Sequence, residues 1–93
     1  MITVTNSAKY FFQCILEYMH QSDFSLRLSH GEGYGQFRFL TDEERCDDLI
    51  VRYYGKPVLL IGSEISSFLE GAIIDCEELD GGIYLTLSFK YAQ

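Results

Sequence analysis

The sequence predicts a mostly β fold with added helix, an α+β domain, over residues 1–93. Two patterns carry this prediction. One N-terminal stretch has apolar residues at helical spacing, and several later stretches alternate apolar and polar residues with the period of a strand. At 93 residues the chain is expected to form a single domain, because domains cluster around ~100 to 150 residues.

The first expected elements are a short strand and the main helix. Residues 2–4 have β character, and Thr5 or Asn6 can cap a helix by accepting a hydrogen bond from a free N–H of its first turn. Apolar residues then recur at spacings of three and four, at Ala8, Phe12, Ile15, Leu16 and Met19. This spacing predicts an amphipathic helix from Ser7 to about His20.

A β-hairpin is expected next, over residues 24–40. Apolar and polar residues alternate over 24–29 and again over 36–39, which is typical of strands with one face on the core and one in water. The first strand would place Phe24, Leu26 and Leu28 inward, and Ser25, Arg27 and Ser29 outward. The connection, residues 30–35, has glycine at every other position. These glycines either bring backbone close to a ligand or only supply the positive φ of a turn.

The middle of the chain begins with the charged run 42–48, which is expected to be an exposed, solvated turn; a docking patch for a basic partner is the alternative. Residues 49–54 regain β character. Pro57 cannot donate to a ladder, so residues 58–61 are expected to begin as an edge or newly entered strand. Ser63 is expected to cap a short helix that runs through Leu69 and stops at Gly71.

The last expected feature is a second hairpin. Residues 72–75 lead into a strand, residues 80–82 signal a tight turn, and residues 83–89 alternate most clearly of all. The outward positions of this last strand are Tyr84, Thr86 and Ser88. Exposed tyrosines favour interfaces, so these three residues form a candidate association surface; scattered surface tyrosines are an equal alternative.

Charge and cysteine content exclude several classes of protein. Seven Lys and Arg against fourteen Asp and Glu give a net charge of −7, which repels a phosphate backbone, so no nucleic-acid partner is expected. The longest apolar run, residues 57–61, is far shorter than the ~20 residues that span a bilayer, so no membrane partner is expected either. Three widely spaced cysteines indicate no disulfide framework, which favours a cytoplasmic location.

One segment carries a resemblance to a known family. The run S-F-L-E-G at 67–71, followed by Ile74, Asp75 and a glycine turn, is similar to the "LxGxxIDY" segment of the A-type carriers of iron–sulfur cluster assembly, the HesB-like domain. The opening residues 2–5 and 7–8 also look like that family's start. The resemblance covers nearly the whole chain, and it implies small twisted β-sheets with one N-terminal helix and one short helix.

The resemblance also implies a chemistry whose ligands this sequence lacks. The family uses three cysteine thiolates, the usual ligands of iron and iron–sulfur clusters. The first belongs in the hairpin connection, where this sequence has Gly33, Tyr34 and Gly35; the other two belong to a Cys-Gly-Cys after the last strand, where the printed sequence has residues 90–93 without cysteine. The cysteines that are present lie in other elements, at Cys14, Cys46 and Cys76.

The leading hypothesis is therefore a cysteine-degenerate, non-catalytic protein that resembles an A-type carrier. It would hold no cofactor and would act in or beside iron–sulfur cluster assembly through contacts with a protein partner. Family members are commonly dimeric or larger, so a homo-oligomer is also expected.

Two alternatives stay open from the residues alone. His30 and Glu32, with neighbouring carboxylates, could bind a metal ion weakly in the glycine-rich connection, although two donors specify little. A cysteine nucleophile is the other alternative. Neither Cys14 nor Cys76 has a sequence-local histidine to activate it, so each is expected to behave as a small apolar side chain.

Overall fold

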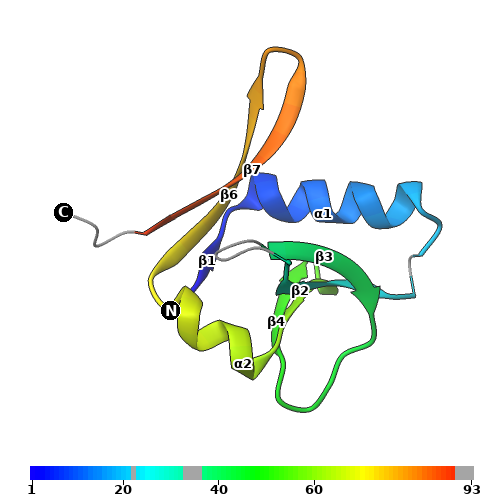
Figure 1. The fold of residues 1–93 in the computed structure, drawn as a ribbon. Coiled ribbons are helices and arrows are strands. Elements are labelled where there is room, and N and C mark those ends of the chain that lie inside the picture. Colours follow the sequence, from blue (N-terminus) through cyan, green and yellow to red (C-terminus); the bar gives the residue numbers. More distant parts are fainter. Residues whose placement is uncertain (22, 33–36, 90–93) are drawn as a thin grey trace.

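The structure is a computed structural model that describes residues 1–21, 23–32 and 37–89. Within them the chain forms two α-helices, one 3₁₀ turn and seven strands arranged in two sheets. Figure 1 shows the long helix α1 lying across the four-stranded sheet, with the hairpin of β6 and β7 standing away from the rest of the molecule. The predicted α+β class is confirmed.

The three-stranded sheet has the order β1-β6-β7. Strand β1 (Thr3–Val4) pairs in parallel with β6 (Ala72–Leu79), and β6 pairs antiparallel with β7 (Gly82–Phe89). The turn between β6 and β7 consists of Asp80 and Gly81, both at positive φ (50° and 80°). Two consecutive residues with positive φ match the twist of a tight hairpin, as the sequence predicted.

The four-stranded sheet has the order β3-β2-β5-β4. Its strands are β2 (Ser25–His30), β3 (Phe37–Asp42), β4 (Leu49–Tyr53) and β5 (Lys56–Ile61). Of the two alternatives for residues 58–61, the edge position is wrong, because β5 lies between β2 and β4. A newly entered strand agrees with the start of β5 at Lys56. Pro57 is accommodated beside the irregularity between Val51 and Arg52 in β4.

The main helix, α1 (Asn6–Tyr18), begins after Thr5, whose hydroxyl accepts from the N–H of Ala8 at 3.2 Å. Its apolar stripe buries Ala8, Phe12 and Leu16 in the core, as the spacing predicted. It packs on β4, β5 and β6. None of the described helices is long and apolar enough to span a bilayer.

The short helical segment consists of α2 (Ser63–Ser66) and a 3₁₀ turn over Ser67–Leu69. Gly62, and not Ser63, is the N-cap residue, and it makes no side-chain cap. The predicted cap at Ser63 is therefore wrong: its hydroxyl donates to Asp47 Oδ2 at 2.9 Å. The predicted stop at Gly71 is confirmed by its φ of +83°.

The burial of residues in two strands, β2 and β7, differs from the pattern that the alternation predicted. In β2, four consecutive residues are buried, Ser25 and Arg27 included, because β2 is an interior strand. In β7, by contrast, Ile83 and Leu87 on the expected core face are 51% and 42% exposed. Phe24, which was expected to point inward, is likewise exposed, and so are Phe39, Phe68 and Phe89.

Candidate functional site

A hydrogen-bond junction joins the two stretches that carry the family resemblance, the opening residues 2–5 and the segment 67–75. The N–H of Thr5 donates to the carbonyl of Ile74 at 3.0 Å, which extends the β1 and β6 pairing. The Thr5 hydroxyl donates to Asp75 Oδ1 at 2.6 Å, and the N–H of Cys76 donates to the same oxygen at 2.7 Å. These two bonds hold the pKa of Asp75 below its usual value. Asp75 therefore anchors the start of α1 to the three-stranded sheet.

The connection between β2 and β3 is the position where the resemblance places the first cysteine. Gly33, Tyr34 and Gly35 lie outside the described residues, so that assignment remains a prediction. His30 is the last residue of β2 and pairs with Phe37 across the hairpin. Its ring stacks on Phe37 and meets the edge of Phe68, each at 6.0 Å between centroids. The surroundings of the His30 ring are thus aromatic.

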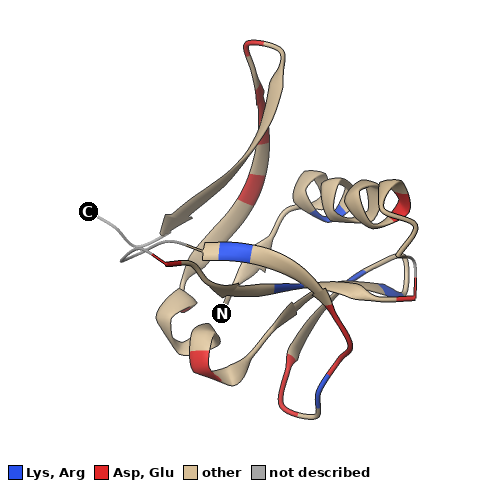
Figure 2. Cartoon of the chain, turned by 45° about the vertical axis from the view of Figure 1, so that its right-hand side comes forward, with Lys and Arg blue, Asp and Glu red and all other residues tan. Residues whose placement is uncertain are grey.

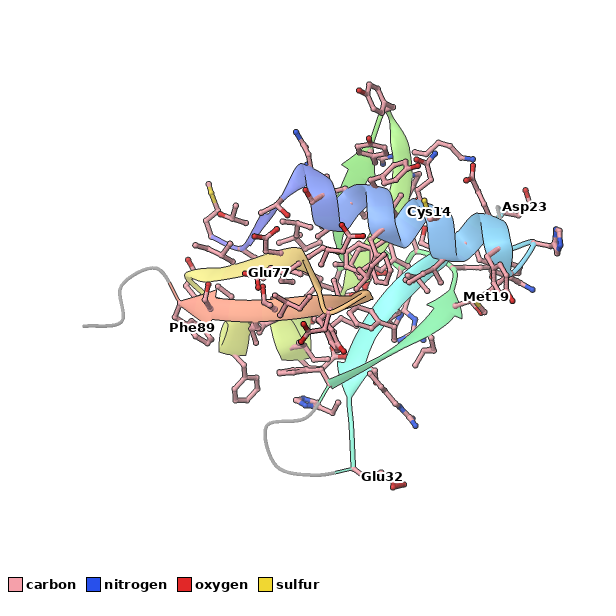
Figure 3. All side chains as sticks on the ribbon, turned by 90° about the horizontal axis from the view of Figure 1, so that it is seen from above. Cys14, Met19, Asp23, Glu32, Glu77 and Phe89 are labelled. Atoms are coloured by element: carbon pink, nitrogen blue, oxygen red, sulfur yellow. The ribbon has the colours of Figure 1, made fainter. Side chains whose placement is uncertain are left out.

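The candidate metal ligands do not converge. Among residues 1–21, 23–32 and 37–89, no three His, Cys, Asp or Glu side chains gather closely enough to hold a metal ion. Glu32 lies two residues beyond the end of β2, and Figure 3 shows it projecting away from the molecule, far from Cys14 on α1. The described residues therefore do not fit a cluster held within one chain.

The three cysteines occupy three different elements. Cys14 lies on α1 and Cys76 on β6, both half-buried, while Cys46 is exposed between β3 and β4. Burial raises the pKa of the Cys76 thiol, and the charges of Asp75 and Glu78 raise it further. The thiolate needed for ligation or nucleophilic attack is therefore disfavoured at Cys76.

Sequence reasoning missed the buried ion pairs of Arg27. Its guanidinium donates to both oxygens of Asp48, at 2.8 and 2.7 Å, and its Nε donates to Asp42 Oδ2 at 2.6 Å. The Arg27 side chain is 8% exposed and the Asp48 side chain 1%. The expectation of an exposed turn agrees with residues 43–47, which are exposed, but it is wrong for Asp42 and Asp48, which carry these contacts.

The pairing of β2 with β3 explains why Asp42 reaches Arg27. Asp42 pairs with Ser25, which places it diagonally across from Arg27 on the same face of the sheet. Leu60 lies beside Arg27 on that face and is fully buried. Arg27 also donates to the carbonyl of Glu43 at 3.1 Å. Arg27 thereby holds the loop of residues 42–48 against the face of the four-stranded sheet that carries Arg27 and Leu60.

The predicted association surface lies on one face of the β6 and β7 hairpin. Tyr84, Thr86 and Ser88 pair with Glu77, Asp75 and Ile73 across the two strands, so these residues share a face. Tyr84 is 54% exposed, and its ring lies over Gly82. Figure 2 shows acidic residues along this hairpin and at its tip, and Figure 3 places Glu77 on β6.

The opposite face of the hairpin borders an apolar groove of about 300 Å³. The four-stranded sheet lines it with Leu28, Phe37 and Phe39, and the three-stranded sheet lines it with Ile74 and with Leu85, Thr86 and Leu87 of β7. The groove accounts for the exposure of Phe39 and Leu87, since the two sheets do not close on each other there. It was not foreseen, because alternation in one strand does not reveal what covers its apolar face.

Comparison with known proteins was made by sequence and by fold. The sequence matches no protein-family model, and it matches no curated protein. The fold matches a crystal structure of IscA with its [2Fe-2S] cluster at a TM-score of 0.64 and 18% identity, over 99% of this chain and 87% of that one. It also matches SufA from Escherichia coli, described as involved in the biosynthesis of iron–sulfur clusters, at a TM-score of 0.69 and 20% identity, over 98% of this chain and 87% of that one.

This chain has the fold of IscA and SufA. The predicted HesB-like fold is confirmed. At 18% and 20% identity the likeness to IscA and SufA concerns the fold, and the activity has to be argued from the residues of this chain.

Proposed function

We propose that this protein is a non-catalytic accessory protein in or near iron–sulfur cluster biogenesis that acts through protein contacts and does not itself carry a cluster. Two points support the proposal. The chain shares the IscA and SufA fold over almost its whole length, and at the place where the family resemblance puts the first cysteine the sequence has Gly33, Tyr34 and Gly35. The shared fold supports the pathway, and the missing thiolates argue against the carrier chemistry.

The placement of the cysteines supports the same proposal. Cys14, Cys46 and Cys76 lie on separate elements, and among the described residues no group of three candidate ligands forms. A cluster would need thiolates brought together from more than one chain. The raised pKa of Cys76, which disfavours its thiolate, also supports a non-enzymatic role. We place the protein in the cytoplasm because free thiols fit a reducing compartment.

Anaerobic reconstitution with iron and sulfide tests this proposal. The visible charge-transfer absorption is recorded for the protein and for a matched variant in which Cys14, Cys46 and Cys76 are all replaced by Ser. The proposal predicts that the two spectra are the same after desalting. A stable chromophore that is present in the unsubstituted protein and lost in the triple variant would show that these cysteines ligate a cluster, and the proposal would be wrong.

A second candidate function is weak binding of a divalent metal ion. It is favoured by the position of His30 and Glu32, which flank the start of the same connection. Titration with Zn²⁺ or Fe²⁺ tests it, with His30→Ala as the variant and His20→Ala as the matched control, since His20 is the other exposed histidine. Saturable binding at micromolar metal that only His30→Ala abolishes would support this function. No saturation in that range would exclude it.

The proposed contacts with other proteins are assigned to Tyr84, Thr86 and Ser88. Tyr84 supports this assignment, because a half-exposed aromatic ring with a polar end is well suited to an interface. We also propose that the protein forms a homo-oligomer. The open groove and the exposed aromatic residues around it support this proposal, because a single small core leaves apolar surface uncovered.

A further inference from the structure

The outer edge of β7 lacks the features that normally prevent an edge strand from pairing. Among the described strands, β7 pairs only with β6, and the eight residue pairs from Ala72↔Phe89 to Leu79↔Gly82 run without a register shift. Its sequence, G-I-Y-L-T-L-S-F, contains no charged residue and no proline. Edge strands that must stay unpaired are usually short, charged, bulged or interrupted by proline. Among the described residues, no strand pairs with the outer edge of residues 82–88, so this part of the edge can accept a further strand.

The outer strands of the other sheet differ in this respect. Strand β3 carries Arg38 and Asp42, and Asp42 is tied to Arg27. Strand β4 has an irregularity between Val51 and Arg52 in its pairing with β5. These are the protections that β7 lacks, so the open edge is a specific feature of the hairpin and not of every outer strand.

The two faces of β7 would offer different surroundings to an added strand. Leu85 and Leu87 border the apolar groove of about 300 Å³. On the other face, Tyr84 and Thr86 lie opposite Glu77 and Asp75. Successive side chains of a strand point to opposite faces, so an added strand would place one set beside Leu85 and Leu87 and the other beside Tyr84 and Thr86. The carboxylates of Asp75 and Glu77 lie on β6, one strand further away.

Charge decides which partner fits. Residues 72–89 contain Asp75, Glu77, Glu78 and Asp80 and no Lys or Arg. A second copy of the chain would bring another acidic hairpin and a net charge of −7 to the contact. A basic segment would instead gain from complementary charge. The carboxylates thus favour a cationic partner over a second copy.

We propose that the edge of β7 binds an extended segment of another protein, in which basic and apolar residues alternate, as an added β-strand. Main-chain hydrogen bonds to β7 supply the affinity. The groove selects the apolar side chains. The negative charge of the hairpin, whose carboxylates lie across β7 from the added strand, attracts the basic ones. This inference deepens the proposed role in protein contacts and rests on it, since it specifies the partner of the surface around Tyr84 and Thr86.

Fluorescence anisotropy with three labelled eight-residue peptides tests the inference. The first alternates Lys and Val, the second alternates Glu and Val, and the third is the Lys and Val peptide with alternate backbone nitrogens methylated. The first is expected to bind saturably and to bind more weakly as salt is raised, because salt screens the charges. The other two are expected to bind at least about tenfold more weakly, since one reverses the charge and the other removes main-chain donors.

Two variants of the protein locate the binding. Glu77→Lys reverses a charge on β6, and Glu44→Lys makes the same change in the exposed loop after β3. Only the first is expected to weaken binding of the Lys and Val peptide, by about tenfold. Amide exchange of residues 83–88 is expected to slow when the peptide is bound.

Three results would overturn the inference: equal binding of the methylated peptide, equal effects of the two variants, or exchange of residues 83–88 that is already slowed by a second copy in the free protein. These results do not depend on cluster chemistry. Cluster formation in the reconstitution experiment would refute the proposed function, whereas peptides that fail to bind in the absence of a cluster would refute only the strand addition.

Discussion

Arg27 is the residue whose environment differs most from the one its sequence position indicates. It occupies an outward position of β2, yet it is buried against Asp42 and Asp48. Taking a guanidinium out of water is costly unless hydrogen bonds and opposite charges compensate it. Here two carboxylates and the carbonyl of Glu43 surround it. The two carboxylates raise the pKa of Arg27, with the hydrogen bonds to Asp48 the largest cause.

Replacement of Arg27 by Met is expected to lower the free energy of unfolding by about 3 to 5 kcal/mol, because the buried carboxylate of Asp48 loses its partner. Urea denaturation measures the change. Arg45→Met is the control: Arg45 also contacts Asp42, but its side chain is 63% exposed, and the expected loss is below about 1 kcal/mol. Equal losses in the two variants would contradict a stabilising role for the buried pair.

The same contact makes stability depend on pH. The guanidinium of Arg27 lowers the pKa of Asp48, and hydrogen bonds from the N–H of Glu43 and from Arg27 lower that of Asp42. Unfolding restores both to about 4, so the unfolded state binds more protons in acid. The stabilisation is therefore complete above about pH 4 and is lost as pH falls through the folded pKa values.

Urea denaturation between pH 7 and pH 3 measures this dependence. Asp48→Asn is expected to be less stable at pH 7 and to lose less of its remaining stability on acidification than the unsubstituted protein. An equally steep loss in this variant would show that other carboxyl groups carry the acid dependence.

At the scale of elements, residue patterns within one segment predicted the main helix and the tight turn, because interactions between residues close in sequence determine both. The spacing of Ala8, Phe12 and Leu16 correctly placed α1, and the turn at Asp80 and Gly81 correctly placed the second hairpin. Strand order was not predictable in this way. The interior position of β5 depends on its pairing with β2 and β4, which are distant in sequence.

For the candidate site too, sequence predicted features within one strand but not those that depend on contacts between distant elements. Sequence alone placed Tyr84, Thr86 and Ser88 on one face of β7, and the register agrees. It could not place the groove between the sheets, because the groove depends on how Phe39 and Leu87, from two sheets, meet in space. It also treated Arg27 as solvated, since alternation assumes that one face of a strand is in water.

The junction at Thr5 joins two elements and gives a prediction at this scale. Thr5→Val removes both the cap on α1 and the hydrogen bond to Asp75, so we expect a loss of about 1 to 2 kcal/mol in the free energy of unfolding. Thr5→Ser, which keeps the hydroxyl, is expected to recover most of this loss. Thr3→Val is the control on exposed β1. If Ser and Val at position 5 have the same effect, the hydroxyl is not the cause.

At the scale of the whole molecule, the acidic surface and the open groove act in opposite directions. A net charge of −7 opposes self-association, whereas the apolar groove and the half-exposed aromatic side chains favour it. Screening by salt weakens only the first of these effects.

Light scattering over a range of salt concentrations tests the proposed homo-oligomer. We expect a mass above that of one 10.7 kDa chain, and a larger oligomeric fraction at high salt. A mass of one chain at every salt concentration would contradict the oligomer.

The measurement that tests the central claim most directly is the count of iron and acid-labile sulfide per chain after anaerobic reconstitution and desalting. The protein described here lacks a convergent set of thiolates among its described residues, and it is expected to retain neither iron nor sulfide. Stoichiometric iron and sulfide that persist through desalting would contradict this account and would make the protein a cluster carrier with a new set of ligands.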